Sequence, residues 1–169
     1  MMHLAPEYRP DELPQHLRDL AFAYLEASEH LCRDLDAGSW PATFLTGQPV
    51  LFLALHATEI FLKACIASAA PAEMKSRHPL GELLATFSSC FPGVPFEPPF
   101  GAEPIPADEV LIALAVKDDA TLNQRFRYPT DSSGTPWGGV RAFSPELFLA
   151  ELERLHGDFD RISAVVFKS

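Results

Sequence analysis

Cysteine is scarce in this sequence, and its three cysteines are far apart. Cys32, Cys65 and Cys90 are odd in number, and each stands among apolar residues. A disulfide framework uses an even set of cysteines, and a zinc cluster uses closely spaced pairs. The pattern therefore predicts buried, reduced thiols and argues against a disulfide-stabilised fold or a zinc site.

Basic residues are also few. The 169 residues include 13 Lys and Arg against 23 Asp and Glu, which gives a formal charge of −10. Such a surface repels phosphates on average, so nucleic-acid binding needs a concentrated basic patch. The local cluster that the sequence offers is Arg125 and Arg127 with Lys117 nearby, and Tyr128 beside them can stack on a base.

Long uninterrupted apolar runs are absent. His56, Glu59 and Lys63 interrupt the most apolar stretch, residues 50–70, so it falls short of the roughly 18 to 20 apolar residues that span a bilayer. The first residues lack the basic and apolar regions of a secretory signal. We therefore expect a soluble, cytoplasmic protein without membrane contact. Its 47% hydrophobic content is enough for the core of one domain, residues 1–169.

Apolar residues recur at helical spacing in five segments, and no segment alternates convincingly like a strand. The predicted helices cover residues 11–36, about 49–70, about 79–90, 108 to about 124, and 145 to about 166. Asp11 is the expected N-cap of the first helix and Gly38 its terminator, while Gly47 and Pro49 are expected to open the second. The sequence predicts an all-α, up-and-down bundle of about five helices.

The last predicted helix begins after Ser144, with Pro145 in the first turn. Its expected buried positions are Leu147, Leu152, Leu155, Phe159, Ile162 and Val166. The third helix is expected to bury Leu80, Leu83, Leu84 and Phe87.

Two non-helical segments differ in composition. Residues 91–106 hold six of the 16 prolines together with Phe91, Phe96 and Phe100. Prolines forbid a regular helix, and aromatic residues are rare in flexible linkers, so we expect an ordered loop laid over the bundle. Residues 130–141 are rich in Ser and Gly, which predicts the most mobile loop of the chain.

His56, Glu59 and Lys63 are spaced to lie on one face of the second helix. One interpretation is a solvated stripe with a Glu59–Lys63 ion pair. A second is a structural clasp, in which an inward-facing Glu59 pairs with Arg125 or Arg127. A third is a ligand-binding or catalytic site.

His56, Glu59 and His78 are candidate metal ligands, because His and carboxylate ligands one helical turn apart converge on an ion. Di-iron bundles need Glu-x-x-His on two helices, and this chain offers one such step, Glu153 to His156. We therefore predict no metal and no cofactor. His78 is expected to cap the third helix.

Several short motifs occur in a recognisable order. They are His56-x-x-Glu59, Leu62-Lys63-Ala64, His78-x-Leu80-x-x-Leu83 and Arg125-x-Arg127-Tyr128-Pro129. Together they resemble the HEPN (higher eukaryotes and prokaryotes nucleotide-binding) domain family. The resemblance implies a helical bundle that commonly forms a homodimer, in toxin–antitoxin, defence and nucleotidyltransferase-associated proteins.

Many HEPN proteins are metal-independent ribonucleases with an Arg followed four to six residues later by His. Here Arg125 and Arg127 are followed by Tyr128 and Pro129, and the next histidine is His156. We therefore predict a non-catalytic interaction or regulatory module, a homodimer with a protein partner. The alternative is a divergent ribonuclease or nucleotide-binding accessory protein that uses residues 125–128 with Glu59 and His56, and binds RNA or a nucleotide.

Overall fold

The computed structural model describes residues 12–73, 79–100, 122–128, 130–136 and 143–167. Four longer helices are α1 (Leu13–Asp36), α2 (Phe44–Ala69), α3 (Leu80–Cys90) and α5 (Pro145–Val166). The described residues also form a short helix, α4 (Leu122–Arg127), and a 3₁₀ turn, η2 (Pro71–Glu73). Within these ranges the sole β interaction is one bridge between Thr130 and Pro136. The all-α class is confirmed.

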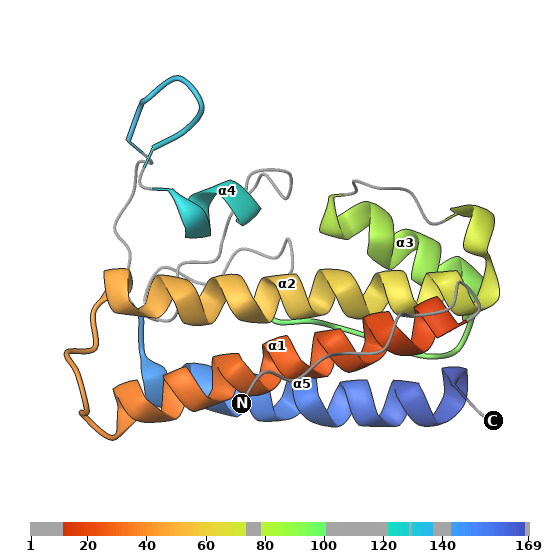
Figure 1. Cartoon of the computed structure of the whole chain (residues 1–169), viewed down its shortest axis with the longest axis horizontal. Helices are drawn as coiled ribbons and strands as arrows, with labels where there is room; N and C mark the ends of the chain where they lie inside the picture. The colour runs from red at the N-terminus through yellow and green to blue at the C-terminus, as the bar shows by residue number, and fades with distance from the viewer. Residues whose placement is uncertain (1–11, 74–78, 101–121, 129, 137–142, 168–169) are drawn as a thin grey trace, which may run out of the picture.

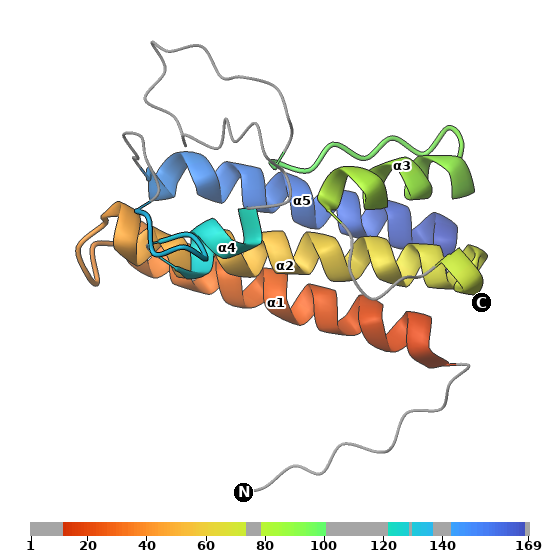
Figure 2. The same ribbon diagram turned by 90° about the horizontal axis from the view of Figure 1, so that it is seen from above.

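Helix α2 lies at the centre of the bundle and contacts α1, α3, α4 and α5. Figures 1 and 2 show α1 and α5 running alongside α2, with α4 over its N-terminal half and α3 along its C-terminal half. The colours in Figure 1 show that α1 and α2 are antiparallel, whereas α3 and α5 run in the same direction as α2. Because α2 and α3 run in the same direction, the expected up-and-down alternation is interrupted between these two helices.

Helix α1 ends as its sequence predicts. Gly38 has φ +71°, a left-handed conformation that glycine adopts without a steric penalty. Its N–H donates to Leu35 O, and the N–H of Ser39 donates to Asp34 O, which together make a Schellman motif. The predicted N-cap, Asp11, lies outside the described residues, and the helix begins after Glu12, which makes no side-chain capping bond.

Helix α2 begins five residues earlier than Pro49, the start that we predicted. Thr43 and Thr46 form a capping box, in which each side chain accepts the other residue's backbone N–H. Pro49 is therefore inside the helix. Gly47 is also inside the helix. Glycine is needed at this position because a Cβ atom there would lie 2.4 Å from the Cγ atom of Phe143. The prediction was wrong because the box uses a second threonine in place of Glu or Gln.

The described part of the predicted Pro/Phe-rich loop, residues 91–100, is ordered against the bundle. Phe96 packs against Phe61 of α2, Phe87 of α3 and Phe159 of α5. Two arginines of α5 hold the backbone, since Arg154 donates to Glu97 O at 2.8 Å and Arg161 to Pro95 O at 2.6 Å. The loop covers the seam between α2, α3 and α5, as expected. Residues 101–106 lie outside the described residues.

Helix α5 confirms four of its expected core positions, Leu152, Leu155, Phe159 and Ile162. The prediction of a buried Leu147 was wrong: it is 44% exposed, and Phe148 is fully buried in its place. Phe148 lies four residues before Leu152 and therefore on the same helical face. Val166 is half-buried against the core. In α3, Leu80, Leu83 and Phe87 are buried, and Leu84 is partly buried.

The predicted helix at residues 108–124 falls almost entirely outside the described residues. The helix that is described nearby, α4, extends to Arg127, so the Arg-x-Arg segment is helical. After it, the Asp131 carboxylate accepts hydrogen bonds from the Ser133 N–H and hydroxyl and from the Thr135 N–H. These bonds lower the pKa of Asp131 and shape the described half of the loop that we expected to be mobile.

The three cysteines are free thiols. Cys32 and Cys65 are buried, and Cys90 is half-buried. Burial raises the pKa of both Cys32 and Cys65 to about 12, which makes these thiols unreactive near neutral pH. The expected buried thiols are confirmed for Cys32 and Cys65, and Cys90 is only half-buried.

Among the described helices, α2 is long and apolar enough to cross a membrane by length and composition. However, 72% of its most apolar window is buried inside the bundle. A buried core helix passes the same composition test, so this finding leaves the predicted location as a prediction.

Candidate functional site

The polar stripe of α2 has the geometry that its spacing predicts. Lys63 Nζ donates to Glu59 Oε1 at 2.6 Å, and His56 Nδ1 lies 3.9 Å from Glu59 Oε2. All three side chains are partly buried, and that of Glu59 is 21% exposed. The Glu59–Lys63 ion pair is therefore confirmed, in a more protected setting than a fully solvated stripe.

The neighbours of Glu59 keep it ionised. The His56 side chain and the Lys63 ammonium lower the pKa of Glu59 from 4.5 to about 2, although burial opposes the change. A general base works best with a pKa near the working pH. Glu59 is therefore poorly suited to abstract a proton and well suited to a structural ion pair.

His56 is enclosed by aromatic rings. Its ring stacks on Phe52, with 5.7 Å between centroids and an interplanar angle of 10°, and meets Tyr24 of α1 edge-on at 4.8 Å. Its Nδ1 atom is buried and has no hydrogen-bond partner among the described residues. These contacts place His56 in an α1–α2 packing interface.

Arg127 contacts α2 at the ring of Phe52. Its Cζ atom lies 4.8 Å from the centroid of the Phe52 ring, a cation–π contact. Within the described part of the chain, the ion-pair partners of Glu59 are Lys63 and His56. The clasp between α2 and the Arg-x-Arg segment thus uses a phenyl ring, where we predicted the Glu59 carboxylate. The Arg125 side chain and His78 lie outside what the structure describes.

An open groove lies between the start of α2 and α4, and we call it the α2–α4 groove. Its volume is about 410 Å³. It is lined by Leu45, Gln48, Pro49, Phe52, Phe126, Arg127 and Tyr128. Leu45 is 71% exposed and Tyr128 is 56% exposed, so apolar and aromatic surface faces solvent at the groove. Two of the predicted site residues, Arg127 and Tyr128, line it together.

Arg127 differs from the other basic side chains that the structure describes. Five of these have a carboxylate partner: Arg18 pairs with Asp19, Arg33 with Glu29, Lys63 with Glu59, Arg154 with Glu151, and Arg161 with Asp158. Arg127 is exposed and has no carboxylate partner within the described residues. In a protein with a net charge of −10, this is an unusual position for a cation.

A second His–Glu pair joins α1 to α5 and was not predicted as a site. His156 Nδ1 and Glu29 Oε1 are hydrogen-bonded at 2.7 Å, and Arg33 donates to Glu29 Oε2 at 3.3 Å. The Glu29 side chain is 8% exposed. Its spacing from Ala21, Leu25 and Cys32 places it on the apolar face of α1, which was the available signal.

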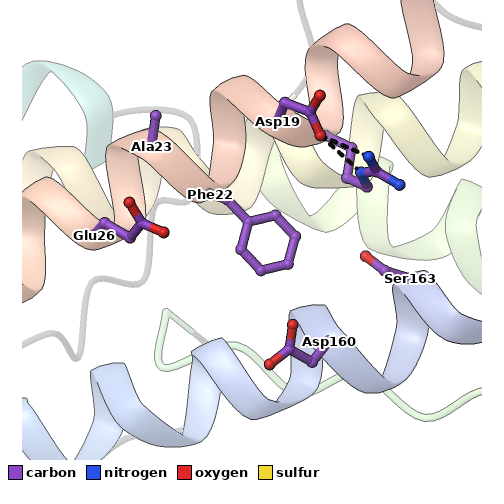
Figure 3. Close-up of a pocket in the computed structure, with 7 residues that line it drawn as sticks. Asp19, Phe22, Ala23, Glu26, Asp160 and Ser163 are labelled. Carbon is purple, nitrogen blue, oxygen red and sulfur yellow. Dashed lines mark hydrogen bonds and ion pairs between the residues drawn. The ribbon is translucent and has the colours of Figure 1, made fainter.

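A shallow groove of about 400 Å³ runs between α1 and α5 (Figure 3). Phe22 projects from α1 toward α5, and Glu26 and Asp160 lie on either side of the groove. Arg18, which also lines the groove, forms an ion pair with Asp19 at 2.7 Å. Phe22 also contacts His156 and Phe159 edge-on, so this ring belongs to the α1–α5 packing.

Catalytic chemistry has little support in these arrangements. Neither His56 nor His156 is hydrogen-bonded to a hydroxyl or thiol in the described ranges, so neither activates a nucleophile there. The same ranges contain no group of three or more His, Cys, Asp or Glu side chains that could hold a metal ion.

Comparison of the chain with protein-family models, curated proteins and solved structures found no match. The resemblance to HEPN domains therefore rests on the motifs of the sequence.

Proposed function

We propose that this chain is a non-catalytic, HEPN-like helical bundle that acts as an interaction module through the α2–α4 groove. The observation that carries the proposal is Arg127, an exposed guanidinium held over Phe52 without a carboxylate partner among the described residues. Arginine and tyrosine are enriched at the energetic centres of protein interfaces. Arg127 and Tyr128 bring both residue types to one groove.

The groove is suited to binding because its parts are held in place. Phe52 stacks on His56, and Phe126 is buried, whereas the next two residues, Arg127 and Tyr128, are exposed. A prepositioned guanidinium loses less conformational entropy on binding than a free arginine does. We infer that the polar stripe of α2 supports this wall of the groove instead of contacting a ligand.

The non-catalytic part of the proposal is supported by the low pKa of Glu59 and by the absence of a histidine four to six residues after Arg125 or Arg127. Labelled RNA incubated with the purified protein tests it, with Arg127→Ala and Arg18→Ala as a matched pair of variants. We expect intact RNA with all three proteins. Cleavage that Arg127→Ala alone abolishes would overturn the proposal.

We also propose a homodimer in the cytoplasm, linked to a toxin–antitoxin, defence or nucleotidyltransferase system, as the HEPN resemblance implies. The mass of the purified protein in solution, measured by light scattering, tests the dimer. A mass of twice 18.6 kDa supports it, and a strict monomer rules out any site shared between two copies.

A second candidate function is nucleotide binding by an accessory protein, and the same groove favours it. Tyr128 can stack on a base while Arg127 contacts a phosphate. The net charge of −10 opposes binding of a long polyanion, but a mononucleotide carries little charge. A titration with uridine and adenosine monophosphates, followed by NMR, distinguishes this function from a protein-binding one.

A further inference from the structure

We infer that the occupant of the α2–α4 groove is a segment of a partner protein that carries one acidic side chain between large apolar ones. This inference rests on the proposed function and names its partner by chemistry. Three features of the groove lead to it: an arginine without a carboxylate partner, exposed apolar walls, and a backbone carbonyl that lacks its helical donor.

The first feature becomes clear beside a second arginine of the same molecule. Arg18 lies over the Phe167 ring at 5.3 Å, much as Arg127 lies over Phe52 at 4.8 Å. Arg18 has Asp19 as its carboxylate partner at 2.7 Å, whereas Arg127 has none in the described part of the chain. A guanidinium on a phenyl ring still has N–H donors at its edge. A carboxylate supplied by a partner would complete the arrangement that Arg18 already has.

The second feature is the apolar surface around that cation. Leu45 is 71% exposed, and the groove continues over Pro49, Phe52 and Phe126. Large apolar side chains on both sides of the partner's acid would cover these residues and exclude water from the ion pair. Exclusion of water strengthens the pairing beyond that of a fully exposed one.

The third feature comes from the proline inside α2. Pro49 has no N–H and cannot donate to Leu45 O four residues earlier, as an ordinary helical residue would. Both residues line the groove. In the proposed complex, a backbone N–H of the incoming segment would donate to Leu45 O in place of the missing helical donor. Arg127 would then bind the acidic side chain of the peptide, and Leu45 O would accept one of its backbone N–H groups.

A nucleic-acid strand fits this groove less well. A strand presents one phosphate per nucleotide, and its affinity grows with the number of cations that contact it. The groove contributes one described cation, Arg127, to a protein whose net charge is −10. The charge balance therefore favours a single carboxylate over a row of phosphates.

The test uses three capped tripeptides that differ in one side chain: leucine-glutamate-phenylalanine, its glutamine analogue and its lysine analogue. Each is titrated into labelled protein while the backbone amide signals of α2 and α4 are followed by NMR. The variants are Arg127→Met, which keeps the side-chain length without the charge, and Arg18→Met as the matched control. Uridine monophosphate is titrated in parallel.

For the wild type and Arg18→Met, we expect the glutamate peptide to bind about three- to fivefold more tightly than the glutamine peptide, and the lysine peptide to bind least. In Arg127→Met the glutamate and glutamine peptides should bind equally. Equal binding to the wild type would overturn the inference, as would the absence of saturable shifts with every peptide. A larger groove response to uridine monophosphate than to the glutamate peptide would replace it with nucleotide binding. RNA cleavage, measured separately, bears on the proposed function and not on the peptide preference.

Discussion

The protein contains two His–Glu pairs that differ in almost every physical respect. His56 and Glu59 lie one helical turn apart on α2, with 3.9 Å between Nδ1 and Oε2. His156 and Glu29 are 127 residues apart, join α5 to α1, and are hydrogen-bonded at 2.7 Å. The first pair was visible in the sequence as a motif, whereas the second was visible only as an unexplained glutamate on an apolar helix face.

The comparison shows that a conspicuous motif and an important contact need not coincide. A pair within one helix persists whenever that helix forms, so it adds little to the tertiary structure. A pair between two helices exists only in the folded protein, and the loss of one partner leaves the other without its hydrogen bond. We therefore expect the α1–α5 pair to dominate stability, and the α2 pair to matter mainly for the groove beside it.

The largest expected effect is that of Glu29→Ala. The substitution removes a carboxylate that is 8% exposed, leaves His156 without its acceptor, and leaves Arg33 with only the longer contact to Glu153, at 3.8 Å. We expect the free energy of unfolding to fall by about 3 kcal/mol. Urea denaturation followed by circular dichroism measures this change. A loss no larger than that of Glu59→Ala would reverse the order of the two pairs.

His156→Ala should have the next largest effect. Glu29 keeps Arg33 as a partner in this variant, so the expected loss is smaller, about 1 to 2 kcal/mol. The double variant Glu29→Ala/His156→Ala completes a cycle. A coupling energy near zero in that cycle would mean that the two side chains do not stabilise each other.

The α2 pair should appear in the pH dependence of stability. The folded-state pKa of Glu59 is about 2, below its usual 4.5, so its contribution is present above pH 4.5 and is lost as the pH falls toward 2. Glu59→Gln should lose about 1 kcal/mol at neutral pH and lose less stability than the wild type between pH 5 and pH 2. Identical pH profiles for the two proteins would show that the Glu59 carboxylate contributes nothing.

The smallest expected change in stability is that of Arg127→Met. Arg127 has no ion pair to lose in the described residues, and its contact with Phe52 is replaced by another flexible side chain. We expect a change of less than about 0.5 kcal/mol by the same denaturation assay. A loss of more than about 1 kcal/mol in the free energy of unfolding would instead mean that the main role of Arg127 is to hold α4 against α2.

The residues explain why sequence reasoning succeeded for some features and not for others. Helical spacing predicted the four longer helices, and Gly38 and Ser144 marked two of their ends, because these signals are local. The start of α2 differs from the prediction because Gly47 and Pro49 were expected to open the helix, whereas both lie inside it. Gly47 is instead required by the ring of Phe143, a contact that no local pattern indicates.

The sequence predicted which residues belong to the candidate site better than it predicted which of them contact one another. The sequence predicts Arg127 and Tyr128 as site residues, and it predicts the Glu59–Lys63 ion pair. The partner of Arg127 depends on where α4 packs along α2, and one turn of a helix separates Phe52 from His56 and another separates His56 from Glu59. A tertiary register of this kind cannot be obtained from spacing within one helix.

We propose that both His–Glu pairs are structural and that the function of the chain lies in the α2–α4 groove. The most direct test is to incubate labelled RNA with the wild type, His56→Ala and His156→Ala, because these histidines are the general bases that the described pairs could supply. The account predicts intact RNA with all three proteins. Cleavage by the wild type that either substitution abolishes would contradict it.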